Sequence, residues 1–148
     1  MTMVMISTSE AMFALGEKIG AQLQAGDLLV LNGPLGAGKT LLTQGIGHAM
    51  GIAGITSPTF VISRFHKGVI PLMHVDAYRL IQSENPFFSL DDLDLESEKE
   101  DAVTVVEWGG ELAARLSQER LEIFIDRTHE VREVSAAGHG KRWENFSL

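Results

Sequence analysis

One short segment carries the clearest chemical pattern in this sequence. Gly33 and Gly38 are separated by four residues, and Lys39 and Thr40 follow directly, which completes the P-loop pattern. Glycines allow backbone torsions that turn successive N–H groups toward phosphate oxygens, and a helix starting here presents its positive end to the same anion. We expect Lys39 on an exposed loop, reaching the β- and γ-phosphates of ATP or GTP, and the Thr40 hydroxyl on Mg²⁺. The alternative is a glycine-rich turn that ends in Lys-Thr by chance.

Two acidic residues come directly after apolar segments that predict strands. Asp76 follows Leu72–Val75, and Glu107 follows Val103–Val106. Ligands bind outside the carboxyl ends of strands in an open α/β sheet, so both acids are expected near the P-loop. We expect Asp76 to bind the metal and Glu107 to position or deprotonate the attacking water, with Glu107 a second candidate metal ligand. The alternatives are a solvated strand-end acid for Asp76 and an ion-paired loop acid for Glu107.

Thr59 is a third candidate, in the segment Ser57-Pro58-Thr59. Its hydroxyl could contact the γ-phosphate as a nucleotide sensor, or it could be a turn residue that caps the next strand.

Phosphoryl transfer also needs positive charge against the γ-phosphate. Besides Lys39, the sequence offers Arg64 and Arg79 near the motif strands, without assigning a position to either.

A sheet and helices must bring these residues together. Leu28–Leu31 is continuously apolar, as expected of a strand buried on both faces of a parallel sheet, and it leads into the P-loop. Before it, Ser7, Thr8 or Ser9 is expected to cap a helix that stops at Gly26. Further elements are expected as a helix at Lys39–Met50, strands at Phe60–Phe65, Val69–Val75, Val103–Val106 and Leu121–Ile125, a helix at Glu111–Leu116 and a hairpin partner at Glu130–Val134.

This alternation of strands and helices predicts one α/β domain. We expect a three-layer P-loop NTPase fold with a parallel-rich central sheet and a C-terminal hairpin. The domain would span residues 1–148, of which 128–148 could form a peripheral tail.

The composition excludes several classes of protein. The chain is 45% hydrophobic and 22% charged and has no cysteine, which excludes a disulfide framework, a cysteine–zinc site and a cysteine nucleophile. It has no apolar run near the roughly 18–20 residues of a membrane span and no secretion signal, so we expect a cytoplasmic protein without membrane contact. The net charge of −8 disfavours unaided binding to DNA or tRNA, because proteins that hold a phosphate backbone alone carry a basic face.

Four motifs in fixed order point to a known family. They are Leu35-Gly36-Ala37-Gly38-Lys39-Thr40, Thr56-Ser57-Pro58-Thr59-Phe60, His74-Val75-Asp76-Ala77-Tyr78-Arg79-Leu80 and Val106-Glu107-Trp108. Together they resemble the bacterial TsaE (YjeE) family, small P-loop ATPases of the tRNA threonylcarbamoyladenosine pathway. The resemblance runs from the first helix to about Arg127.

The resemblance implies ATP hydrolysis in support of a complex of the TsaD transferase and its TsaB companion, which modifies adenosine 37 of tRNA. It implies that Asp76 is the Walker-B acid, Thr59 a switch threonine, Glu107 the catalytic acid and Trp108 an aromatic residue beside it. The candidate nucleotide-binding residues are Gly33, Leu35, Gly36, Ala37, Gly38, Lys39, Thr40, Leu41 and Trp108; the catalytic ones are Lys39, Thr59 and Glu107; the magnesium ligands are Thr40, Asp76 and Glu107.

Some positions depart from the family pattern. Pro34 stands where an Asp is usual, Leu41 where a Thr is frequent, and Gly109 where a Pro is frequent. The phosphate cradle needs no side chain at Pro34 or Leu41, so its function is not in doubt. The turn after Trp108 is left uncertain by Gly109.

Other functions remain as alternatives. A metabolite kinase needs an arginine-bearing lid, and residues 77–101 offer only Arg79. A GTPase switch needs Asp-x-x-Gly after the strand and an Asn-Lys-x-Asp guanine reader, and the sequence contains neither at the expected place. A nucleotide-gated assembly module, in which hydrolysis only resets a complex, is compatible with the resemblance. We expect an ATPase that is weak alone and activated by its partners.

Overall fold

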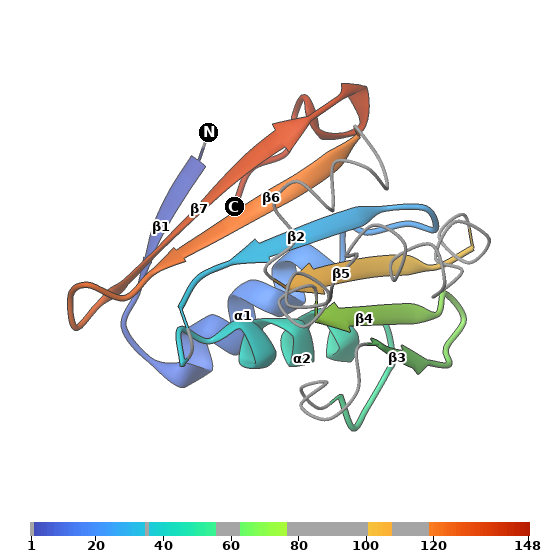
Figure 1. Ribbon diagram of the computed structural model, residues 1–148, viewed down its shortest axis with the longest axis horizontal. Coiled ribbons are helices and arrows are strands. Elements are labelled where there is room, and N and C mark those ends of the chain that lie inside the picture. The colour runs from blue at the N-terminus through green and yellow to red at the C-terminus, as the bar shows by residue number, and fades with distance from the viewer. Residues whose placement is uncertain (1, 35, 56–62, 77–100, 108–118) are drawn as a thin grey trace, which may run out of the picture.

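The computed structural model describes residues 2–34, 36–55, 63–76, 101–107 and 119–148. Two helices and seven strands occur in these ranges (Figure 1). In chain order the elements are β1 (Thr2–Ile6), α1 (Ser9–Gly20), β2 (Leu28–Asn32), α2 (Lys39–Ala49), β3 (Ser63–His66), β4 (Leu72–Asp76), β5 (Val103–Glu107), β6 (Arg120–Asp126), β7 (Arg132–His139) and the 3-10 turn η1 (Lys141–Trp143).

The strands form one mixed sheet in the order β1-β7-β6-β2-β5-β4-β3. The four adjacent strands β6, β2, β5 and β4 run parallel, whereas β3, β7 and β1 pair antiparallel with their neighbours. This confirms the α/β class, the parallel centre and the C-terminal hairpin, which is β6–β7. The helix expected at Glu111–Leu116 lies outside the described residues.

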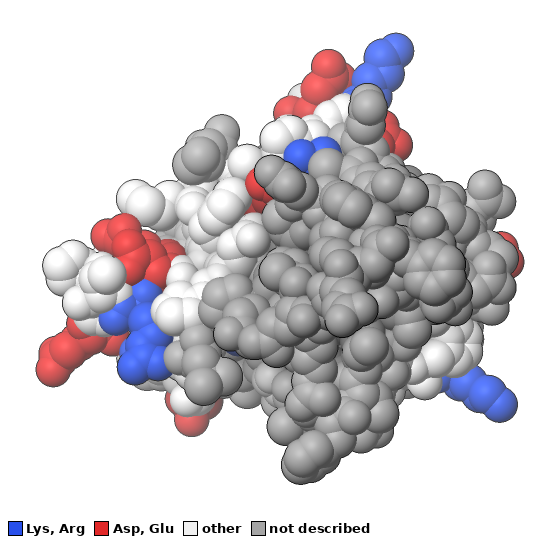
Figure 2. All heavy atoms as spheres, viewed as in Figure 1, with Lys and Arg blue, Asp and Glu red and all other residues white. Residues whose placement is uncertain are grey.

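The sequence did not predict β1. Its Met3 and Met5 side chains are 61% and 55% exposed, and the strand is held by pairing with β7, which lies far away in the chain. Because β7 lies between β1 and β6, residues 132–139 contribute an inner strand of the sheet rather than a tail beside it. Where Figure 2 shows described residues, the Lys and Arg side chains lie in separate places, beside Asp and Glu at the left and top of the view.

Both described helices cover the same face of the sheet (Figure 1), and their backbones touch. A Cβ on Gly16 of α1 would lie 2.2 Å from the carbonyl oxygen of Leu42, and one on Gly45 of α2 would lie 2.1 Å from that of Phe13. Only glycine fits at either position. Between the helices and the sheet lies the apolar core, which includes the fully buried Leu31 of β2. Neither described helix is long and apolar enough to cross a membrane.

Several predicted boundaries were wrong: the hairpin partner expected at Glu130–Val134 is Arg132–His139, and two others have a clear local cause. The first helix is capped by Thr8, whose Oγ1 accepts from Ala11 N at 3.0 Å, but it ends at Gly20. Gly26, expected as its stop, lies in the following turn with φ 94°. The strand expected from Val69 begins only at Leu72, because Val69 is fully exposed and a proline, which lacks an N–H, stands directly before the strand.

The amino end of β2 is fastened by an ion pair. Arg142 donates from Nε to Asp27 Oδ1 and from Nη2 to Asp27 Oδ2, both at 2.9 Å, and also to the carbonyl of Gln22 at 2.7 Å. Asp27 is buried, and the Arg142 guanidinium lies 4.3 Å from the ring centre of the buried Trp143. The Asp27–Arg142 pair therefore connects η1 to the turn that leads into β2.

Candidate functional site

The predicted P-loop lies at the opposite, carboxyl end of β2. Two of its glycines adopt left-handed torsions, with φ 77° at Gly36 and 116° at Gly38, which side chains disfavour. Gly38 is the residue directly before α2, so the turn delivers the chain into the helix. Leu35 lies outside the described residues. At Gly36 and Gly38 the backbone therefore has the torsions that the glycine spacing predicts.

Lys39 is the first residue of α2, and it is buried rather than exposed on a loop as expected. Its Nζ donates to the carbonyl of Gly33 at 2.7 Å and to that of Pro34 at 3.1 Å. The side chain thus folds back over the start of its own loop. Phosphate oxygens are stronger acceptors for an ammonium than neutral carbonyls. A phosphate bound at the loop could therefore replace the two carbonyls as hydrogen-bond partners of Lys39 Nζ.

The N-terminus of α2 supplies the remaining donors. The first helical bond of its opening turn runs from Leu42 N to the carbonyl of Gly38 at 2.9 Å. The amides before it, of Lys39, Thr40 and Leu41, have no carbonyl four residues back within the helix. They lie at the positive end of the helix dipole, which favours an anion.

The strand-end acids come to the same edge of the sheet. In the parallel register Asp76 of β4 pairs with Glu107 of β5, and Glu107 pairs with Leu31 of β2. Glu107 is 5% exposed and is the last residue of its strand, not a loop acid. Its Oε1 lies 3.2 Å from Nε2 of His74. The register thus brings both acids next to the start of the P-loop.

Several predicted site residues are not described. Thr59 and Trp108 lie outside the described residues, and for Asp76 only the backbone is described. Within the described ranges, no three or more His, Asp or Glu side chains gather into a group that could hold a metal ion. The predicted magnesium ligands Thr40, Asp76 and Glu107 therefore stay a prediction.

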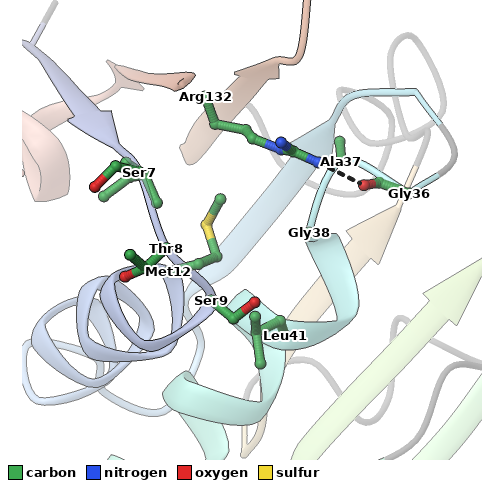
Figure 3. A pocket seen from close by; sticks show the side chains of 10 residues that line it. Ser7, Thr8, Ser9, Met12, Gly36, Ala37, Gly38, Leu41 and Arg132 are labelled. Atoms are coloured by element: carbon green, nitrogen blue, oxygen red, sulfur yellow. Dashed lines mark hydrogen bonds between the residues drawn. The ribbon is translucent and has the colours of Figure 1, made fainter. Parts of the chain in front are cut away.

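A hollow of about 270 Å³ lies beside the P-loop, and sequence reasoning missed it. Ser7, Thr8 and Ser9 line it from the link between β1 and α1, and Arg132 reaches across from β7 (Figure 3). Arg132 donates a long hydrogen bond of 3.5 Å to the carbonyl of Gly36. The remaining walls are Ile6, Met12, Ala37, Gly38 and Leu41.

Arg127 approaches the loop tip as well. A Cβ on Gly36 would lie 2.7 Å from Arg127 Nη1, and Arg127 lines a second hollow of about 490 Å³ beside the loop. In the same wall, Asp126 accepts hydrogen bonds from the amide and the hydroxyl of Thr128 at 2.8 and 2.7 Å. These bonds, the backbone one first, hold the pKa of Asp126 below its usual 3.8. Arg127 and Arg132 are the described arginines at Gly36, whereas Arg79 and the side chain of Arg64 lie outside the described residues.

Known proteins are similar to this chain in sequence and in fold. Residues 6–134 match the family described as "Threonylcarbamoyl adenosine biosynthesis protein TsaE". A tRNA threonylcarbamoyladenosine biosynthesis protein TsaE of Mycobacterium tuberculosis is 51% identical over 125 residues, covering 80% of this chain and 74% of that protein. The Bacillus subtilis protein of the same name is 39% identical, covering 88% and 82%. The crystal structure of B. subtilis YdiB has a TM-score of 0.76 at 34% identity and covers 96% of this chain and 88% of that one.

Proposed function

Since the chain belongs to the TsaE family of threonylcarbamoyl adenosine biosynthesis proteins, we propose that it is the Mg²⁺-dependent ATPase of this tRNA-modification machinery. It would act in the cytoplasm with TsaD and TsaB. The observation that carries the proposal is the loop from Gly33 to Lys39. Its glycines have the torsions of a phosphate cradle, and the Lys39 ammonium already lies over the loop.

The phosphates would lie on the amides at the start of α2, with Lys39 against the β- and γ-phosphates. Thr40 and Asp76 would hold Mg²⁺, which lowers the charge on the phosphates, with Glu107 a second candidate ligand. Glu107 would also orient the attacking water and accept its proton. Thr59 would sense the γ-phosphate, and Trp108 would lie beside the nucleotide.

The hollow next to the loop suits the sugar and base of the nucleotide. It adjoins Ala37 and Gly38 of the loop and extends to the Ser7–Ser9 link. Arg132 lies on its wall and contacts the loop tip, so one side chain could respond to both halves of the ligand. The absence of a guanine-reading motif from the sequence favours ATP over GTP.

The partners would complete the catalytic site and supply the tRNA. The net charge of −8 gives this chain little attraction for a phosphate backbone. Phosphoryl-transfer sites are commonly finished by an arginine from a partner, worth about 10³–10⁵ in rate. We therefore expect slow hydrolysis by this chain alone.

The test is steady-state ATP turnover by the purified chain, alone, with the TsaD–TsaB pair and with tRNA alone. We expect turnover to rise several-fold or more with the pair and to change little with tRNA. A rate on the order of 1–100 s⁻¹ for the isolated chain, without response to the pair, would contradict the proposal and favour a metabolite kinase.

The acids are separated by a second measurement. Asp76→Asn should weaken the Mg²⁺-dependent part of ATP-analogue binding, because a hard cation prefers a charged oxygen. Glu107→Gln should bind nearly normally and turn over slowly. Equal loss of metal-dependent binding in both variants would mean that Glu107 is also a metal ligand.

A further inference from the structure

We propose that His74 is a positioning residue for Glu107. Its Nε2–H holds one carboxylate oxygen of Glu107, so that the other is presented for the reaction in a fixed orientation. The inference rests on the catalytic role proposed for Glu107, and it assigns a task to a buried histidine that the phosphate cradle does not use.

The geometry comes from two adjacent parallel strands. His74 of β4 pairs in register with Val105 of β5, and Asp76 pairs with Glu107. His74 and Glu107 are therefore diagonal neighbours on one face of the sheet. Nε2 lies 3.2 Å from Oε1, and the two side chains are 0% and 7% exposed. A hydrogen bond between buried groups is stronger than one in water, so this bond can hold the Glu107 side chain in one rotamer.

The hydrogen-bond inventory of His74 gives the direction of the bond. A carboxylate oxygen only accepts, so Nε2 must carry the proton. Nδ1 is buried and has no hydrogen-bond partner in the part of the chain that the structure describes. With the proton on Nε2, Nδ1 is left as an acceptor. Among the described residues, the imidazole thus has one polar contact, which is Glu107 Oε1.

Packing alone does not account for a histidine here. Leu72 and Val75 of the same strand are apolar and fully buried, and an apolar side chain at position 74 would leave no buried nitrogen unpaired. We infer that the free-energy cost of burying Nδ1 without a partner is offset by the hydrogen bond from Nε2 to Glu107. Glu107, a nearly buried acid, gains a donor and loses rotational freedom, which is the preorganisation that a catalytic base needs.

The test compares three substitutions in the full chain with the TsaD–TsaB pair present. The amide nitrogen of His74→Gln reaches the ε position, that of His74→Asn reaches only the δ position, and His74→Leu has no donor. We expect Leu and Asn to lower kcat for ATP by about 10–100-fold with Kd for Mg-ATP changed less than about threefold, and Gln to restore kcat to within a few-fold of the parent.

Coupling to Glu107 provides the control. In a Glu107→Gln background, His74→Leu should lower single-turnover hydrolysis no further. An additive loss, equal kcat for the Gln and Asn variants, or a parallel fall of kcat and binding-competent fraction would overturn the positioning role. If His74→Leu does not fold, the Gln and Asn variants still decide.

Failure of the proposed function looks different. If Glu107→Gln alone turns over ATP at the parent rate, Glu107 is not the catalytic base. The role proposed for Glu107 and the positioning role of His74 then both fail. If Glu107→Gln is slow while His74→Leu and His74→Asn are normal, only the role of His74 is wrong.

Discussion

The two ends of β2 hold cations in contrasting ways. At the carboxyl end, Lys39 donates to the backbone carbonyls of Gly33 and Pro34. At the amino end, Arg142 makes two hydrogen bonds of 2.9 Å to the carboxylate of Asp27. The printed contacts of Lys39 thus include neutral carbonyls of the loop that a phosphate could replace, whereas those of Arg142 include both oxygens of a carboxylate on the same chain.

Under the proposed function, Lys39 is a charge that binds a ligand and Arg142 is a charge that stabilises the fold. A bidentate guanidinium–carboxylate pair is satisfied in charge and in geometry, so a ligand can gain little by entering it. Carbonyl contacts are weaker, and a phosphate can replace them at small cost. The sign and burial of a side chain do not distinguish the two cases, but the identity of its acceptors does.

Lys39→Ala should have the largest effect on ligand binding. We expect affinity for Mg-ATP to fall by at least about a thousandfold, or about 4 kcal/mol, because the charge against the β- and γ-phosphates is lost. The free energy of unfolding should change by less than about 1 kcal/mol, since the two carbonyls lie on a loop that water can reach. Titration with a fluorescent ATP analogue and urea unfolding measure both quantities. Parent-like affinity would show that the cradle assignment is wrong.

Arg142→Ala should show the reverse. Asp27 would remain buried without its cation, and we expect a loss of about 3 kcal/mol in stability, a fall in Tm of roughly 6–12 °C. At a temperature where the variant is folded, its ATP affinity should stay within about twofold. Thermal unfolding with Lys141→Ala, an exposed neighbour, as the control checks this. Weakened binding without loss of Tm would break the contrast between the two ends.

Arg132→Ala should have a smaller effect, confined to binding. We expect nucleotide affinity to fall by about three- to tenfold with no change in Tm, because the bond to the Gly36 carbonyl is long, 3.5 Å, and weak. Calorimetric titration with ATP, and with inorganic triphosphate, shows which part of the ligand Arg132 serves. Lys67→Ala removes one positive charge at an exposed site and serves as the control for the loss of charge alone.

The smallest effect should come from Thr128→Ala. The hydrogen bonds from Thr128 lower the pKa of Asp126, so the stability they contribute is fully present above pH 3.8 and is lost as the pH falls through the lower folded value. Removing the hydroxyl should move the carboxyl pKa, followed by NMR titration, up toward 3.8. The stability difference between variant and parent should be constant above about pH 5 and shrink below pH 3.8. An unchanged pKa would mean that the backbone amide of Thr128 alone sets it.

The sequence predicted what depends on neighbours along the chain. The torsions at Gly36 and Gly38, the Thr8 cap and the apolar β2 are local features, and each occurs where its pattern indicated. The acids Asp76 and Glu107 could be placed at one edge because parallel strands end together. Their proposed roles, and those of Thr59 and Trp108, were not decided by this.

What the sequence missed depends on residues far apart. β1, the reach of Arg132 to Gly36, and the pairing of Asp27 with Arg142 all depend on β7 or η1, about a hundred positions away. Nothing in the first residues of the chain specifies such a partner. The burial of Lys39 was missed because the ammonium turns back to its own loop, and the P-loop pattern describes the liganded arrangement.

The contact between Gly16 and Gly45 affects the hollow beside the P-loop through the positions of the two helices. α1 begins at one wall, at Ser9, and α2 begins at the other, directly after Gly38. Each start is about two turns from the crossing point, where backbone meets backbone and no side chain can yield. The spacing of the two helix starts therefore depends in part on a contact that lies away from the hollow. A Cβ at the crossing would have to push the helices apart, so under the proposed function a substitution there should change the space for a nucleotide without altering any residue that lines it.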